Sequence, residues 1–88
     1  MENKKIYTET YNNKKELVFT DYNGENAKNK LMSLLYDKLI VKSRYIKNIQ
    51  YQYNYADLQK VTFIYDNGYR EIFYNIPTKM GTLDITRL

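Results

Sequence analysis

The hydrophobic positions along the chain follow two different periods, and the longer period marks a helix. Apolar residues recur three or four positions apart through residues 25–39, at Ala27, Leu31, Leu34, Leu35 and Leu39. Asn23 stands where a helix cap is expected, and Glu25 suits the positive end of the helix dipole. We therefore predict one amphipathic helix over residues 25–39. Residues 40–47 fit either a frayed extension of this helix or a loop.

Before the helix, the sequence has the character of a β-hairpin. Residues 4–11 and 16–22 are rich in β-branched and aromatic side chains, which favour strands. Asn12-Asn13-Lys14 between them is a turn signal. The pattern predicts two antiparallel strands joined by this turn.

After the helix, strict alternation predicts a further strand over residues 49–55. Ile49 shares one face of this strand with three tyrosines, whereas Gln50, Gln52 and Asn54 occupy the other face. Residues 61–65 and 69–76 then flank Asn67-Gly68, a strong signal for a hairpin. A two-residue loop there would pair Tyr65 with Arg70, Phe63 with Ile72 and Val61 with Tyr74. Pro77 ends the last of these strands, and residues 82–88 alternate again.

Together these elements predict an α+β fold in a single domain over residues 1–88. We expect the order ββαβββ, with an antiparallel sheet of five to six strands and the helix packed on one face. The other face would then be left to solvent or to a partner. The expected core consists of apolar positions from every element: Ile6, Leu17, Phe19, Leu31, Leu34, Leu35, Leu39, Ile49, Val61, Phe63, Ile72, Tyr74 and Ile85.

The residue types that are missing exclude several kinds of chemistry. The chain has no cysteine, which excludes disulfides, thiolate–zinc sites and thiol catalysis, and no histidine, which removes the commonest general base. Its carboxylates are scattered, and its three glycines cannot form a phosphate-binding loop. We therefore expect no enzyme activity, no metal and no cofactor. A small ribonuclease-type toxin built on Glu71, Arg70, Tyr74 and Arg87 remains as one alternative.

The positive charge is concentrated in one segment. The chain carries a net charge of +4, and residues 25–47 account for all of it. A solvated helix end would explain these cations, because they suit the negative end of the helix dipole. A contact to phosphate, or to an acidic groove of a partner, is the functional alternative, and it would use Lys38, Lys42, Arg44, Tyr45 and Lys47.

Tyrosine is unusually frequent, with 11 residues against three phenylalanines. Tyr51, Tyr53 and Tyr55 could be core residues whose hydroxyls reach the rim of the sheet. Alternatively, together with Tyr69 and Arg70, they form a binding platform, because Tyr and Arg are enriched at protein interfaces. Such a platform would also stack on the bases of single strands, although few cations lie among these tyrosines.

Asn, Lys, Tyr and Ile together make 40 of the 88 residues, and all four have A/T-rich codons. This bias is typical of a low-GC bacterium, or of a phage or plasmid that lives in one. No apolar run is long enough to span a membrane, and no signal-peptide core is present, so we expect a soluble, cytoplasmic protein.

The leading hypothesis is a small, non-enzymatic protein-binding module. Its most specific form is a phage- or plasmid-encoded inhibitor of a nucleic-acid-handling machine, with an anti-CRISPR or other anti-defence role. Because the chain is positive, it would occlude or lock its target, and it would not mimic DNA. A nucleic-acid-binding protein that uses residues 38–47 and stacking tyrosines is the alternative. Pairing of an exposed sheet edge with a second copy would make a homodimer.

Overall fold

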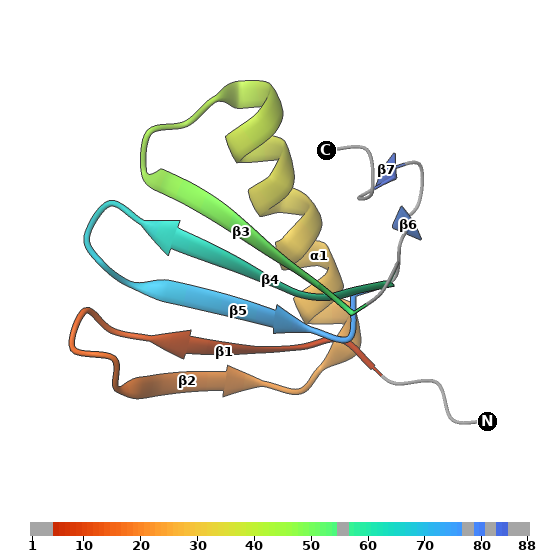
Figure 1. Cartoon of the computed structure of the whole chain (residues 1–88), viewed down its shortest axis with the longest axis horizontal. Coiled ribbons are helices and arrows are strands. Elements are labelled where there is room, and N and C mark those ends of the chain that lie inside the picture. The colour runs from red at the N-terminus through yellow and green to blue at the C-terminus, as the bar shows by residue number, and fades with distance from the viewer. Residues whose placement is uncertain (1–4, 55–56, 77–78, 81–82, 85–88) are drawn as a thin grey trace.

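A computed structural model describes residues 5–54, 57–76, 79–80 and 83–84. Two strands, β1 (Tyr7–Tyr11) and β2 (Leu17–Asp21), precede the helix α1 (Gly24–Tyr36) and a short π-helical segment η1 (Asp37–Val41). Three longer strands follow, β3 (Ile46–Asn54), β4 (Asp57–Tyr65) and β5 (Arg70–Tyr74), and then two short ones, β6 (Lys79–Met80) and β7 (Leu83–Asp84). Figure 1 shows their arrangement.

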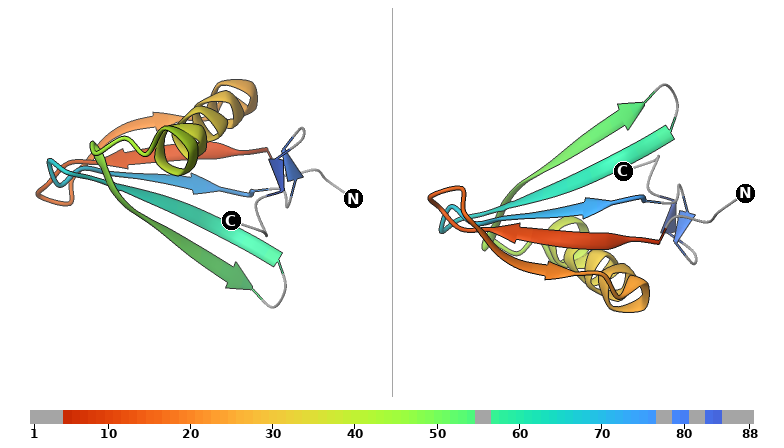
Figure 2. Two further views of the ribbon diagram at one scale, coloured as in Figure 1. Left: turned by 90° about the horizontal axis from the view of Figure 1, so that it is seen from above. Right: turned by 90° about the horizontal axis from the view of Figure 1, so that it is seen from below.

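The main sheet has five strands in the order β2-β1-β5-β4-β3, and every neighbouring pair is antiparallel. Both views of Figure 2 show α1 on one side of this twisted sheet only. The predicted α+β class and the order ββαβββ are therefore confirmed. The strand expected within residues 82–88 is β7, which pairs with β6 in a separate two-stranded sheet.

The helix begins and buries one face as its sequence predicts. The side-chain oxygen of Asn23 accepts hydrogen bonds from the backbone N–H groups of Glu25 and Asn26, both at 3.1 Å. The ordinary α-helix ends at Tyr36, and one π-helical turn continues it to Val41. Lys42 then ends the helix in the left-handed region, with φ 60°. Residues 42–45 are the connection to β3, and residues 46–47 already belong to β3. The undecided segment 40–47 is therefore partly helix, partly loop and partly strand.

The β4–β5 hairpin differs from the prediction by one residue. The backbone N–H of Gly68 donates to the carbonyl of Tyr65 at 3.0 Å, and the N–H of Tyr65 donates to the carbonyl of Tyr69 at 2.9 Å. The loop therefore contains three residues, 66–68, with Gly68 at φ 91°. An Asn-Gly pair suits this loop as well as the two-residue one, because both need a residue with positive φ.

This shift of one residue exchanges the two faces of β5. Val61 pairs with Phe73 and Phe63 pairs with Glu71, so Phe73 and Glu71 point into the core. Both are almost completely buried, at 0% and 2% exposed. Ile72 is half-buried on the opposite face. The three predicted pairs, Tyr65 with Arg70, Phe63 with Ile72 and Val61 with Tyr74, are therefore wrong.

The core is otherwise close to the expected one, with corrections at the sheet edge. Leu17 and Phe19 were expected in the core, but they lie on the edge strand β2 and are 51% and 53% exposed. Tyr74 lies on the helix-free face, and Ile85 lies outside the described residues. The buried apolar residues are Ile6, Ala27, Leu31, Leu34, Leu35, Ile46, Leu58, Val61, Phe63, Phe73 and Ile76, with Leu39 and Ile49 packed partly buried against them.

One hydroxyl in the core has no hydrogen-bond partner within the described part of the chain. It is that of Thr8, which pairs with Phe73 and is 1% exposed. Because an unsatisfied buried polar group costs about 1–3 kcal/mol, we expect Thr8→Val to raise the free energy of unfolding by about 1 kcal/mol. Thr10→Val is the matched control, since the Thr10 hydroxyl donates to Glu71 at 3.5 Å. Urea denaturation checks both; equal effects of the two substitutions would contradict the assignment.

Candidate functional site

The register of three strand pairs, β1 with β5, β5 with β4 and β4 with β3, defines a helix-free face of the sheet, since directly paired residues point to the same side. Three rows of side chains cross β1, β5, β4 and β3 on this side. We call their twelve residues the open face: Tyr7, Tyr74, Lys60 and Gln52; Glu9, Ile72, Thr62 and Gln50; Tyr11, Arg70, Ile64 and Asn48.

An aromatic stack lies at one end of the open face. The Tyr7 ring stacks on Tyr74, with centroids 4.6 Å apart and planes inclined by 15°. On its other side it stacks on Tyr22, which follows β2, with centroids 5.3 Å apart. The Lys60 ammonium lies 5.9 Å from the centroid of the Tyr74 ring, within the range of a cation–π contact. We call Tyr22, Tyr7 and Tyr74 the tyrosine stack.

Glu9 fixes the hydroxyl ends of two tyrosines on this face. Its Oε1 accepts hydrogen bonds from Tyr74 at 2.8 Å and from Tyr11 at 3.2 Å. Burial and these bonds to Glu9 raise the pKa of both tyrosines above the ordinary value of 10.0. The bonds hold the rings in place before any partner arrives, which lowers the entropy cost of binding.

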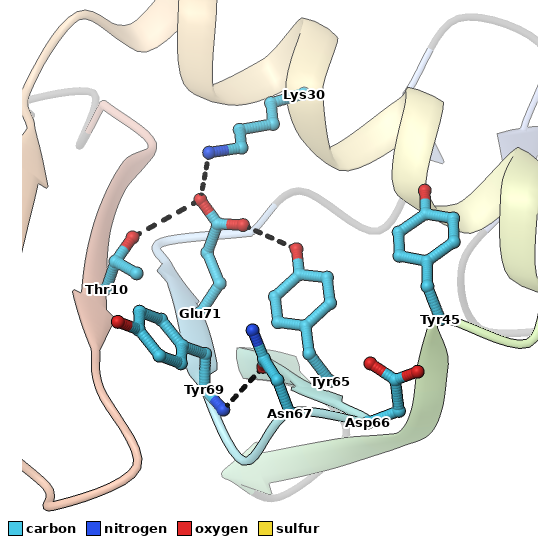
Figure 3. A pocket seen from close by; sticks show the side chains of 8 residues that line it. All are labelled: Thr10, Lys30, Tyr45, Tyr65, Asp66, Asn67, Tyr69 and Glu71. Carbon is cyan, nitrogen blue, oxygen red and sulfur yellow. Dashed lines mark hydrogen bonds and ion pairs between the residues drawn. The ribbon is translucent and has the colours of Figure 1, made fainter.

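A second candidate site lies on the helix side of the sheet, where α1 leaves the loop end of the β4–β5 hairpin uncovered. A cavity of about 380 Å³ lies there (Figure 3). At its base the buried carboxylate of Glu71 accepts a hydrogen bond from the Tyr65 hydroxyl at 2.7 Å and forms an ion pair with Lys30. We call it the Glu71 cavity, and its lining residues are Thr10, Lys30, Tyr45, Tyr65, Asp66, Asn67, Tyr69 and Glu71.

Most members of the tyrosine platform expected on β3 and β5 lie apart in the structure, whereas Tyr51 and Arg70 line the same cavity. Tyr51 is half-buried against the core on the helix side, Tyr53 is 48% exposed, and Tyr55 lies outside the described residues. Tyr69 lines the Glu71 cavity, whereas Arg70 lies on the open face. The adjacent residues 69 and 70 thus point to opposite sides of the sheet, as alternation along a strand requires.

Part of the predicted basic site is used within the fold. The Lys38 ammonium donates to the backbone carbonyl of Ile46 at 3.0 Å, and the Tyr45 hydroxyl donates to the carboxylate of Asp37. These two contacts tie the end of the helix to the start of β3. The other three members of the set are exposed: Lys42, Arg44 and Lys47.

The residues considered for ribonuclease chemistry are separated by the sheet. Glu71 points to the helix side, whereas Arg70 and Tyr74 point to the open face. Arg87 lies outside the described residues.

Within the described ranges, no group of three or more Asp and Glu side chains could hold a metal ion. No described helix combines the length and apolar character that are needed to cross a bilayer.

The sequence did not indicate the tyrosine stack, because Tyr74 lies far along the chain from Tyr7 and Tyr22. The alternation of Tyr7, Glu9 and Tyr11 was a usable signal for one face of β1. What the sequence did not indicate is that β1 pairs with β5, which brings Tyr7 beside Tyr74.

Comparison with known proteins adds no assignment, since no family model, curated protein or solved structure matches this chain.

Several tyrosines are held in the protonated form, so we expect stability to fall at alkaline pH. The hydrogen bond to Asp37, with burial, raises the pKa of Tyr45 to about 12, from 10.0. Burial and the bond to Glu71 raise the pKa of Tyr65. A raised native pKa stabilises the fold below pH 10 and ceases to do so as the pH rises toward 12.

Phenolate absorbance measured against pH checks this expectation. Near a pH of about 11, the native protein should contain fewer ionised tyrosines than the denatured chain. The Tyr45→Phe variant should lose a smaller fraction of its free energy of unfolding between neutral pH and a pH of about 11 than the natural chain does, because it lacks one tyrosine with a raised pKa. Coincident titration curves for native and denatured protein would contradict the hydrogen bonds described above.

Proposed function

We propose that this protein is a non-enzymatic protein-binding module that contacts its partner through the open face. The observation that carries the proposal is the tyrosine stack, which offers preorganised aromatic surface on the side of the sheet that α1 does not cover. Tyr22 is 70% exposed at the outer end of this stack, so it can make new contacts without a change in the fold. Large, rigid aromatic side chains of this kind dominate the energetics of protein interfaces.

The charges of the open face favour an acidic partner surface. Glu9 is engaged by the hydroxyls of Tyr11 and Tyr74, whereas Lys60 and Arg70 extend from the neighbouring strands. A shallow cavity of about 420 Å³ is lined by these two cations together with Gln50, Tyr51, Gln52, Thr62 and Ile72. A partner that places carboxylates opposite Lys60 and Arg70 would complement this face and would associate faster at low salt.

The more specific form of the proposal is an inhibitor of a nucleic-acid-handling machine, encoded by a phage or plasmid. It rests on the amino-acid composition, in which 40 of the 88 residues are Asn, Lys, Tyr or Ile, four types with A/T-rich codons. A net charge of +4 favours occlusion or locking of the target over mimicry of DNA.

A pull-down from a low-GC bacterial lysate, with and without nuclease, tests this function. Performed at about 0.1 M and 0.5 M salt, it separates aromatic contacts from phosphate contacts, because binding to many phosphates weakens steeply with salt whereas aromatic contacts do not. We expect one protein to be retained after nuclease treatment at the higher salt, and to be lost with the Tyr22→Ala variant. Retention of nucleic acid alone, released at high salt, would instead favour Lys42, Arg44 and Lys47 as the functional site.

A further inference from the structure

We propose that the Glu71 cavity is a binding site for a guanidinium group, such as an arginine side chain. This site lies on the opposite side of the sheet from the open face and does not depend on the function proposed there. Its volume, about 380 Å³, is at the lower end of the range for ligand pockets, roughly 300–1,000 Å³. It therefore suits one side chain and not a large ligand.

The walls of the cavity are aromatic. The rings of Tyr45 and Tyr65 lie nearly parallel, with planes 9° apart and centroids separated by 6.1 Å. Tyr69 contributes a third ring from the opposite wall, and it is 38% exposed (Figure 3). The hydroxyls of Tyr45 and Tyr65 already donate to Asp37 and Glu71, so these two residues present mainly their rings. Aromatic faces are electron-rich and attract cations, and planar guanidinium groups stack on them well.

The charge of the lining selects a cation over an anion. The lining contains two carboxylates, Asp66 and Glu71, and one ammonium, that of Lys30, so the cavity is negative in a protein whose net charge is positive. The Asp66 carboxylate forms no ion pair within the described part of the chain. An entering anion would meet a buried carboxylate at the base, because Glu71 is only 2% exposed.

Lys30 acts as an internal competitor for the ligand. It forms an ion pair with Glu71, yet 47% of its side chain is exposed, so its ammonium can withdraw into solvent. A guanidinium group could then reach Glu71 with two parallel hydrogen bonds, which an ammonium cannot supply. This competition predicts how the affinity for a guanidinium ligand changes when Lys30 is replaced. Removing Lys30 should strengthen binding, because it removes both the competitor and the repelling charge.

Titration with N-acetyl-arginine amide, followed by backbone NMR, tests the site. N-acetyl-citrulline amide is the control, since it has nearly the same shape without the charge. We expect the arginine probe to shift the amide resonances around Asn67 and Tyr69, and the citrulline probe to leave them unchanged. Lys30→Gln should bind about tenfold more tightly and Asp66→Asn about tenfold more weakly. Lys28→Gln changes the net charge equally outside the cavity and should match the natural chain.

Two further measurements keep the test decisive if a variant is unstable. The arginine probe should raise the melting temperature of Lys30→Gln more than that of Lys28→Gln, because binding to the folded state stabilises it. A short Gly-Ser peptide with one arginine distinguishes the source: tighter binding than the free probe assigns the ligand to a protein chain, and equal binding assigns it to a small molecule. Equal shifts with the arginine and citrulline probes, or no gain in affinity with Lys30→Gln, would overturn the proposal.

Discussion

Replacing Phe73 with alanine is expected to lower the free energy of unfolding by about 3–5 kcal/mol, the usual cost of truncating a buried phenylalanine. Phe73 is fully buried and packs edge-to-face against Phe63, with ring centroids 5.6 Å apart. Ile72→Ala should cost only about 1–2 kcal/mol, because Ile72 is half-buried on the open face. Denaturation in urea, with the midpoint and slope measured for each variant, gives both values.

The order of these two costs tests the register of the β4–β5 hairpin. The three-residue loop places Phe73 and Glu71 on the helix side of the sheet, whereas a two-residue loop would place Ile72 there. A larger loss of unfolding free energy for Ile72→Ala than for Phe73→Ala would show that the hairpin has a two-residue loop instead. Glu71 would then leave the cavity, and both candidate sites would lose the residues that define them.

The second large effect concerns binding. Tyr22→Ala should weaken the affinity for the captured partner by about thirtyfold, which corresponds to roughly 2 kcal/mol and is typical of an interface hot spot. Tyr22 is 70% exposed, so the melting temperature should change little. Titration calorimetry, with each variant titrated into the purified partner, gives the dissociation constants.

Tyr36→Ala is the matched control for this prediction. Tyr36 is another exposed tyrosine, at 57%, but it lies at the end of α1 and outside the open face. We expect its substitution to leave the affinity within about twofold of the natural chain. Equal losses for the two variants would show that exposed tyrosine in general, and not the stack, supports binding.

Local sequence signals predicted the elements well, because each such signal lies within a few residues of its effect. Asn23 caps the helix through its own backbone neighbours, and the apolar spacing from Ala27 to Leu35 defines the buried face. The Asn12 side chain likewise closes the first hairpin by accepting from the N–H groups of Lys14 and Glu16. None of these contacts needs information from elsewhere in the chain.

The register and the candidate sites could not be predicted in the same way. Asn67-Gly68 permits loops of two or three residues, and the choice depends on how Phe73 and Phe63 pack in the core. Glu71 is buried because Lys30 from the helix and Tyr65 from β4 satisfy its charge, and no local pattern shows that. The open face likewise depends on β1 pairing with β5, and the paired residues lie about sixty positions apart in the chain.

Labelling of lysines in the free protein and in the complex tests the central claim most directly. Lys60 lies on the open face beside Tyr74, whereas Lys42 and Lys47 lie in the exposed basic segment. Acetylation measured by mass spectrometry reports the reactivity of each. If the open face is the binding surface, the partner should protect Lys60 and leave Lys42 and Lys47 as reactive as before. Protection of Lys42 and Lys47 with Lys60 unchanged would contradict the account and move the binding surface to the basic segment.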